Sequence, residues 1–190
     1  KSKNIPVLIM TDAIDQFWLP MIGSFKDKKF TSITQGQINL DDLDEKNKDK
    51  KSESKDQKEK QDKEYVDLIA QMKVVLGEQV KDIRLSSKLT DSPVCLVADD
   101  GDMDIAMEQL MAQRDTNYKG APRILEINGD HSLIKNMKSL LSKKENNDLV
   151  SDAGTLLFEQ ARLLEGKMPA DPAQFSKIMN QFLLKAIPAK

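Results

Sequence analysis

Cysteine and histidine are nearly absent from this sequence, since each occurs once among 190 residues, as Cys95 and His131. A single cysteine excludes an internal disulfide and a cysteine-based zinc site, and it fits a reducing compartment. A single histidine excludes a histidine-based metal site or a histidine-dependent catalytic triad within one chain. We therefore assign His131 a structural role in the first turn of a helix.

Long apolar runs and glycine-rich motifs are lacking as well. No stretch approaches the roughly 20 apolar residues that a membrane-spanning helix requires. Residues 1–10 lack the length and order of a signal peptide, so we predict a cytoplasmic protein without a membrane span. The glycines are isolated, and none of them forms a pattern that cradles phosphate.

Outside one segment, neither positive nor negative charge is in excess. The chain has 29 basic and 31 acidic residues, and residues 41–64 contain eight of the basic and ten of the acidic ones. The remaining chain is therefore balanced at 21 of each sign, which argues against a nucleic-acid partner. Apolar residues make up only 39% of the chain, and this deficit lies mostly in the charged segment.

Residues 1–40 have the pattern of the end of an α/β unit. The apolar run at residues 5–10 predicts a buried strand, and Thr11 and Asp12 offer a cap for a helix that follows. The β-branched residues of 29–40 predict a further strand. Because the chain begins without methionine and runs straight into a strand-like stretch, we expect it to be a piece of a longer protein.

The charged segment, residues 41–64, contains Leu43 as its one apolar side chain. It therefore cannot offset the entropy of ordering by burying side chains in a core. We interpret it as a mobile charged tether. The alternative is a solvated helix with ion pairs between residues four apart.

The next part of the chain alternates between helices and strands. Apolar spacing in residues 65–76 predicts a helix that ends near Gly77. Residues 80–86 and 94–98 are two strand candidates, separated by a turn, that we predict to pair as a hairpin. Asp102 then caps a helix that runs through Ala112.

A third strand and three helices complete the predicted elements. Residues 123–127 alternate like a half-buried strand, and a helix follows over 131–141. The last two helices are predicted at 149–165 and 171–187. The second one begins with Asp171 as its cap and a proline at its first helical position.

The last two helices carry more apolar surface than they can bury against each other. This surplus predicts a four-helix bundle across a two-fold axis, and therefore a homodimer. The predicted interface residues are Leu149, Ala153, Leu156, Leu157 and Leu164 in the first helix and Phe175, Ile178, Met179, Phe182 and Leu183 in the second. The alternative is that both faces pack on the strands of the same chain.

A methionine-rich stripe is the second informative feature. Its members are spaced i, i+4, i+7 and i+8, which places them on one helical face: Met103, Met107, Leu110 and Met111. Methionine is flexible and polarizable, so such a face suits contacts with varied apolar surfaces. The alternative is that the stripe belongs to the core. Ile105 and Ala106 mark a different face that could be buried in its place.

Four acidic residues in close sequence raise the possibility of a metal site: Asp99, Asp100, Asp102 and Asp104. A calcium-binding loop would need glycine and a bidentate glutamate where this sequence has Ile105 and Met111. We therefore interpret the acids as turn and cap residues. A carboxylate-metal hydrolase is the remote alternative.

Several stretches of the chain, in this order, resemble the heat-shock protein 90 chaperone family. They are VLIMTDAIDQFW at 7–18, LGEQVKDIRLSSKLTDSPVCLV at 76–97, EINGDHSLI at 126–134 and MNQFLL at 179–184. The pattern R-L-x-x-x-L-x-D-S-P at 84–93 is the most specific. The first stretch matches the end of the family's middle domain, and the others match its C-terminal dimerisation domain.

The resemblance implies an α+β fold in three parts. A fragment of the middle domain, with strand, helix and strand, would cover residues 1–40, and the charged linker or solvated helix would cover 41–64. Residues 65–190 would form a small mixed α/β C-terminal domain, with a three-stranded sheet and a helical dimerisation bundle.

The family consists of ATP-dependent molecular chaperones that act in protein folding and in the stress response. The resemblance implies that ATP and magnesium bind in an N-terminal domain outside this chain, so we expect no catalytic residue and no cofactor here. The implied partners are a second copy of the chain and unfolded or partly folded client proteins. A bacterial cochaperone of the seventy-kilodalton heat-shock system is a further implied partner.

The resemblance also favours exposure of the methionine stripe, because the family places an exposed client-contact helix at the matching residues. Phe17 and Trp18 match a second region of client contact. The alternative function is a structural dimerisation or adaptor module in which the stripe is buried and binds no client.

Two departures from the family pattern affect these expectations. Gly129 stands where the family usually has proline, which loosens the turn before His131. The sequence ends without the acidic tail motif that eukaryotic cytosolic members use to recruit helical-repeat cochaperones. We therefore expect a bacterial protein that lacks this class of partner.

Overall fold

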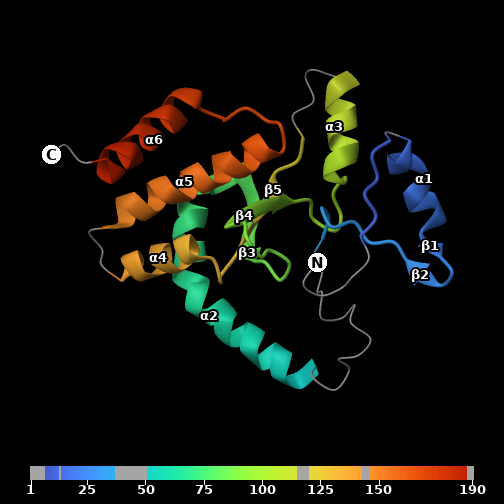
Figure 1. Cartoon of the computed structure of the whole chain (residues 1–190), viewed down its shortest axis with the longest axis horizontal. Helices are drawn as coiled ribbons and strands as arrows, with labels where there is room; N and C mark the ends of the chain where they lie inside the picture. Colours follow the sequence, from blue (N-terminus) through green and yellow to red (C-terminus); the bar gives the residue numbers. More distant parts are fainter. Residues whose placement is uncertain (1–6, 13, 37–50, 115–119, 143–145, 188–190) are drawn as a thin grey trace.

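The computed structural model describes residues 7–12, 14–36, 51–114, 120–142 and 146–187. The described helices are α1 (Asp15–Ile22), α2 (Lys51–Leu76), α3 (Ile105–Arg114), α4 (Ser132–Leu141), α5 (Asn147–Leu164) and α6 (Pro172–Ala186). The described strands are β1 (Ser24–Phe25), β2 (Lys28–Lys29), β3 (Val80–Leu85), β4 (Val94–Val97) and β5 (Arg123–Ile127). A short 3-10 helix at Gly77–Gln79 joins α2 to β3. The chain is therefore a mixed α/β structure (Figure 1).

The central sheet has the strand order β3-β5-β4. β5 runs parallel to β3 and antiparallel to β4. The predicted hairpin of β3 with β4 is therefore wrong, because β5 lies between them. All five residues of β5 are buried, so the predicted alternation of buried and exposed side chains is wrong as well. A central strand whose two faces are both covered does not need that alternation.

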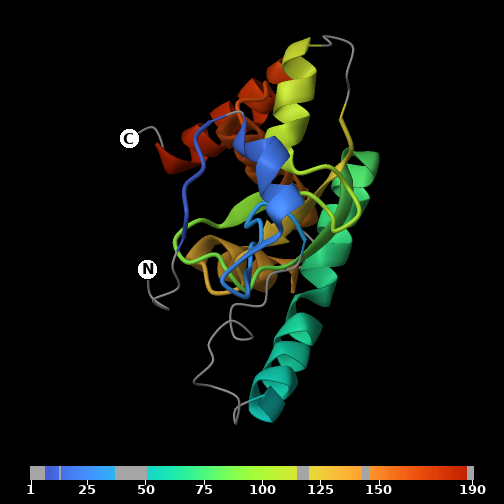
Figure 2. The ribbon, with the colours of Figure 1, turned by 90° about the vertical axis from the view of Figure 1, so that its right-hand side faces the viewer.

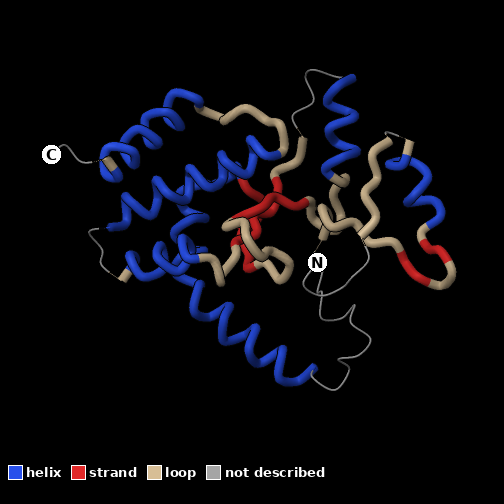
Figure 3. Tube along the Cα trace, viewed as in Figure 1, coloured by secondary structure: helices blue, strands red, loops and turns tan. Residues whose placement is uncertain are grey.

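Three helices, α2, α4 and α5, form the core together with the sheet (Figure 3). The largest fully buried side chains include Leu68, Met72, Leu76, Leu125, Ile127, Ile134, Met137 and Val150. A Cβ atom added at Gly154 of α5 would lie 3.4 Å from Cγ of Met72 in α2. Glycine therefore allows these two helices to approach closely.

Residues 51–64 are helical, so for them the helix holds and not the mobile tether, of the two alternatives that the sequence left open for the charged segment. These residues form the first part of α2, which continues without a break through Leu76. This first part extends away from the sheet (Figures 1 and 2). Lysine and glutamate favour helix, and adding turns to a helix that the core already holds avoids the cost of nucleation. Residues 41–50 lie outside the described residues.

The N-terminal strand prediction also fails where the structure describes it. Residues 7–10 form no strand, and the side chains of Val7, Leu8 and Ile9 are 61%, 67% and 84% exposed. No strand among the described residues pairs with this run, so its apolar pattern lacks the sheet that would bury it. Within residues 29–36, the described part of the strand predicted over 29–40, the strand pairing consists of the end of β2 and one parallel bridge between Gln35 and Ala98. Residues 37–40 lie outside the described residues.

Polar side chains cap several of the helices. His131 caps α4, where its Nδ1 atom accepts a hydrogen bond from the Leu133 amide at 3.1 Å. Asp171 caps α6, as predicted, by accepting from the amides of Ala173 and Gln174. The predicted cap at Asp12 is absent. The Asp12 side chain accepts no hydrogen bond from the first turn of α1. Instead, the Asp12 backbone amide donates to the Asp15 carboxylate.

Candidate functional site

Helix α3 carries Met107, Leu110 and Met111 of the methionine stripe. The helix lies to one side of the sheet (Figure 1). Asp104 caps this helix, because its Oδ1 atom accepts from the Ala106 amide at 2.9 Å. The predicted cap, Asp102, instead forms an ion pair with Lys81 at 2.9 Å. The helix therefore begins two residues later than a cap at Asp102 would place it. The predicted helical stripe is wrong for Met103, which lies before the helix, whereas Met107, Leu110 and Met111 are on α3.

The four stripe residues, Met103, Met107, Leu110 and Met111, are called the methionine face below. Met103 and Met111 are each 42% exposed, and the other two side chains are half-buried. The opposite face of α3 is the buried one, since Ile105 is 7% and Glu108 is 4% exposed. The methionine face is therefore not part of the chain's core.

A buried ion pair holds α3 against the sheet. Glu108 pairs with Arg123 of β5, and its Oε1 atom also accepts from the Ala121 amide at 2.8 Å. Arg123 donates to the Met103 carbonyl at 3.1 Å. Burial lowers the pKa of the Arg123 guanidinium, and the negative charge of Glu165 opposes that shift. The contact fixes the inner face of α3 and turns the methionine face outward.

The acidic residues before α3 act as ion-pair and turn residues. Lys81 bridges Asp99 at 2.8 Å and Asp102 at 2.9 Å. The hydrogen bond from Lys81 lowers the pKa of Asp99, and the two carboxylates together raise the pKa of Lys81. Among the described residues, no cluster of three histidine, cysteine, aspartate or glutamate side chains is arranged to hold a metal ion.

Helix α6 presents a second apolar surface. Its inner side packs on α5, with Ile178 buried and Phe182 partly buried against the core. Its outer side leaves Met179 40%, Leu183 50% and Ile187 72% exposed. Met179 and Leu183 lie on α6, and Ile187 directly follows its last residue. The three residues are four apart and form one stripe, which is called the α6 outer stripe below.

The residues predicted for the dimer interface fall into three groups. Leu164, Met179 and Leu183 are exposed, while Leu149, Leu156, Phe175 and Phe182 are half-buried. Ala153, Leu157 and Ile178 are 9%, 4% and 4% exposed, so the chain's own core already covers them. These three are therefore removed from the proposed interface. The alternative of packing within one chain holds for the inner face of α5, which contacts β4 and α2.

The second predicted client-contact region lies in α1. Phe17 is 47% exposed, and Trp18 is half-buried with its indole N–H donating to Asp15 at 2.9 Å. The neighbouring side chains Ile14, Met21, Ile22 and Phe25 are also exposed, by 54% to 86%. Region α1 lies on the same side of the molecule as α3 (Figures 1 and 2).

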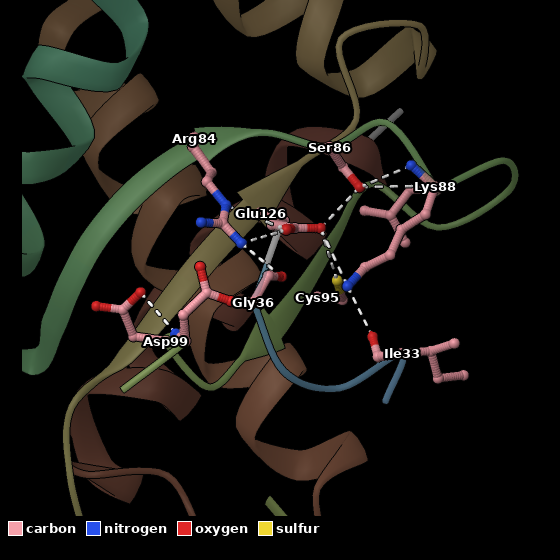
Figure 4. A network of polar contacts seen from close by, with 10 residues as sticks. Ile33, Gly36, Arg84, Ser86, Lys88, Cys95, Asp99 and Glu126 are labelled. Carbon is pink, nitrogen blue, oxygen red and sulfur yellow. Dashed lines mark hydrogen bonds and ion pairs between the residues drawn. The ribbon is translucent and has the colours of Figure 1, made fainter. Parts of the chain in front are cut away.

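A buried polar network on the sheet was missed by the sequence analysis (Figure 4). The Glu126 side chain, on β5, is only 3% exposed and accepts from Arg84 at 2.9 Å and from Ser86 at 2.9 Å. Lys88 lies 3.4 Å from it, and the Cys95 thiol lies 3.9 Å away. These partners are 31 to 42 positions distant in sequence. The only local signal was a carboxylate between the apolar residues Leu125 and Ile127 of the strand.

The Cys95 thiol belongs to this network, and its pKa is raised to about 11. Burial is the main cause, because a thiolate is poorly solvated there. The negative charge of Glu126 adds to the shift, and Lys88 and Arg84 oppose it. Cys95 is therefore a neutral thiol at physiological pH.

The same network holds a segment from the N-terminal part of the chain. Arg84 donates to the Gly36 carbonyl and Lys88 donates to the Ile33 carbonyl, each at 2.8 Å (Figure 4). The two cations thus connect Glu126 on one side to the backbone of residues 33–36 on the other.

The Hsp90 protein family model matches the chain from residue 1 to residue 190. The chain belongs to the Hsp90 family. The chaperone protein HtpG of Roseobacter denitrificans is 39% identical over 189 residues, which cover 98% of this chain and 30% of that protein. HtpG of Wolbachia pipientis wMel is 37% identical over 97% of the chain and 28% of its own length. HtpG of Streptomyces coelicolor is 35% identical over 94% and 27%.

Membership of the Hsp90 family confirms the resemblance that the sequence stretches indicated. The chain spans less than a third of the length of these HtpG relatives. Among the described residues, no helix combines the length and the apolar character needed to cross a bilayer.

Proposed function

We propose that this chain is the C-terminal portion of an ATP-dependent molecular chaperone, which forms homodimers and contacts unfolded or partly folded client proteins. One observation carries the proposal: Met103, just before α3, and Met111, on α3, are each 42% exposed, while Ile105 and Glu108 of that helix are buried. A purely structural adaptor with a buried methionine face does not account for that orientation.

The division into parts follows the family. Residues 1–40 are assigned to the end of the middle domain and residues 65–190 to the C-terminal dimerisation domain. ATP and magnesium are assigned to a part of the full-length protein outside this chain, so the chain itself performs no catalysis. We place the protein in the bacterial cytoplasm, with a cochaperone of the seventy-kilodalton heat-shock system as a further partner.

The dimer contact is assigned to the α6 outer stripe and the end of α5. Met179, Leu183 and Ile187 would be left in water by a single chain, and so would Leu164, which is 75% exposed. Burial of apolar area stabilises association by about 25 cal/mol per Å² before the costs of binding are counted. A two-fold axis allows the same stripe on both subunits to cover itself.

Client contact is assigned to the methionine face, with Phe17 and Trp18 as a second contact region. Four partly exposed apolar side chains offer an apolar patch of about a few hundred Å², the size at which surface patches begin to mark interaction sites. One such patch binds weakly. Two copies in one dimer raise the affinity for an extended client through effective concentration.

The test is suppression of client aggregation by the full-length protein with Met103→Gln and Met111→Gln together. Glutamine keeps the length and the helix propensity of methionine but removes its apolar surface. We expect suppression to fall by about threefold to tenfold, because weak apolar contacts of roughly 1 kcal/mol are lost. Light scattering should show an unchanged dimer.

The matched control is Val74→Gln on α2, which removes an apolar side chain that is 80% exposed. It should leave suppression unchanged, since it does not touch α3. Full suppression by the double methionine variant would refute the client-contact proposal and favour the adaptor alternative.

A further inference from the structure

One carboxylate connects the N-terminal part of the chain to the start of α3. The Oδ1 atom of Asp104 caps the helix by accepting from the Ala106 amide at 2.9 Å. Its Oδ2 atom accepts from two hydroxyls about 70 residues earlier in the chain, Ser32 Oγ at 2.5 Å and Thr34 Oγ1 at 2.9 Å. Hydrogen bonds to a charged acceptor are the stronger ones in proteins.

Residues 32–36, called the bracket below, are themselves fixed on the sheet. Backbone hydrogen bonds join the bracket to Ala98, from Gly36 N to Ala98 O at 2.8 Å and from Ala98 N to Thr34 O at 2.9 Å. Arg84 and Lys88 hold the carbonyls of Gly36 and Ile33 (Figure 4). The bracket thus lengthens the sheet beyond β4.

The bracket also contacts the turn that leads into α3. The Gln35 side-chain amide donates to the Asp102 carbonyl at 2.7 Å. Gly36 has φ +68°, and a Cβ atom there would collide with the Asp100 carboxylate. The backbone of residues 100–104 therefore follows the bracket closely on its way to the helix.

We propose that Ser32 and Thr34 are positioning residues that set the direction of α3 through Asp104. A carboxylate is planar and rigid, so its two oxygens move together. A displacement of the bracket therefore moves the helix cap, and with it the first turn that carries Met107. The bracket follows directly on the α1 and β1-β2 region, so it couples the orientation of the methionine face to that region.

The second support of α3 acts on a different part of the helix. Glu108 pairs with Arg123, and Gln109 donates to the Glu165 carbonyl at 3.0 Å, both at the middle of α3. Arg123 also donates to the Met103 carbonyl at 3.1 Å, just before the helix. The bracket adds the two hydroxyl contacts to the cap residue itself, so its loss weakens the support of the first turn without removing every contact there. Loss of the bracket contacts is therefore expected to loosen the first turn of α3 and leave the sheet in place.

The test is hydrogen–deuterium exchange on the full-length protein with Ser32→Ala and Thr34→Val together. These changes remove both hydroxyls and leave Asp104 in place. We expect the amides of the first turn of α3 to exchange about tenfold faster, as local opening becomes easier. The amides of β5 should be unaffected.

The rescue variant, Ser32→Thr with Thr34→Ser, keeps both hydroxyls on changed side chains. It should restore slow exchange, which a merely structural change in the loop would not do. Unchanged exchange in the Ala/Val variant, or equally fast exchange in the rescue variant, would overturn the proposal.

The significance of this coupling for clients rests on the proposed function, and the two are separable. Aggregation suppression is measured on the same variants. Fast exchange with reduced suppression supports both proposals. Fast exchange with unchanged suppression supports the positioning role of Ser32 and Thr34, and counts against client contact by α3.

Discussion

Two pairs of methionines occupy opposite environments in this chain. Met72 on α2 and Met137 on α4 are 0% and 2% exposed, whereas Met103 and Met111 at α3 are each 42% exposed. All four have apolar neighbours at helical spacing, so the pattern around them is alike. The comparison shows that periodicity selects one face of a helix, and that the neighbouring elements decide whether this face is buried.

The difference arises from what packs against each helix. Helices α2 and α4 contact α5 and each other, and the apolar stripes of all three meet in one core. Helix α3 instead turns an ionic residue inward, because Glu108 meets Arg123 of β5. An ion pair in the buried position leaves the methionines of α3 on the outside.

The largest expected effect is on stability. Replacing Met137 with Ala empties a position in a close-packed core and should lower the free energy of unfolding by about 2 to 5 kcal/mol. The same replacement at Met111 should change it by less than about 0.5 kcal/mol, as is usual for surface positions. Urea denaturation of both full-length variants measures the two values. Equal losses would show that Met111 is packed as tightly as Met137.

The fold was predictable where a local pattern and its tertiary environment agree. The bounds of β5 and the cap of α6 came from the sequence because turn, cap and apolar residues all indicate the same boundary. The cap of α4 did not, since His131 was expected within the first turn and lies just before it. We predicted a hairpin of β3 with β4 because strands that are close in sequence usually pair. The prediction was wrong because β5 lies between them. No residue pattern in or near β3 and β4 indicates that β5, more than 20 residues later, lies between them.

The candidate site was predictable only in part, for a similar reason. The spacing of the methionines gave Met107, Leu110 and Met111 on one face of α3, although the helix begins after Met103. The surplus of apolar residues gave a predicted interface that includes Met179 and Leu183 of the α6 outer stripe but not Ile187. The bracket and the Glu126 network depend on contacts between residues that are tens of positions apart. Charged and hydroxyl side chains have many possible partners, so composition alone does not select the right one.

Cys95 gives a third environment for sulfur, a thiol buried beside a carboxylate. The pKa of the Cys95 thiol is raised to about 11, so its thiolate fraction at pH 8 is about a hundredfold lower than that of a cysteine with the ordinary value near 9. Alkylation by iodoacetamide should be slower by about the same factor. The rate should rise about tenfold with each pH unit, up to about pH 11.

The control for this measurement is Ala112→Cys in a Cys95→Ser background. Ala112 is exposed on α3, so this thiol should titrate near its ordinary pKa and react rapidly. Mass spectrometry gives both rates as a function of pH. An inflection near pH 9 for Cys95 would contradict the stated burial of its thiol.

The smallest expected effect separates the two exposed apolar surfaces from each other. In the single chain Met179 is 40% exposed, almost the same as the 42% of Met103 and Met111. If the outer stripe of α6 forms the dimer contact, hydrogen peroxide should oxidise Met179 about fivefold to tenfold more slowly than Met103 and Met111, because the partner covers its thioether. Peptide mass spectrometry on the full-length dimer measures the three rates.

The decisive variant is Leu183→Asp, which places a charge within the outer stripe and should release monomers. Met179 should then react as fast as Met103 and Met111. Gln181→Asp is the matched control, because two residues earlier lies on the other side of a helix with 3.6 residues per turn. It should leave both the dimer and the protection of Met179 intact. Equal oxidation rates of all three methionines in the unmodified dimer would place the subunit contact elsewhere. The three side chains are almost equally exposed in one chain, so their rates differ only if a second chain covers one of them.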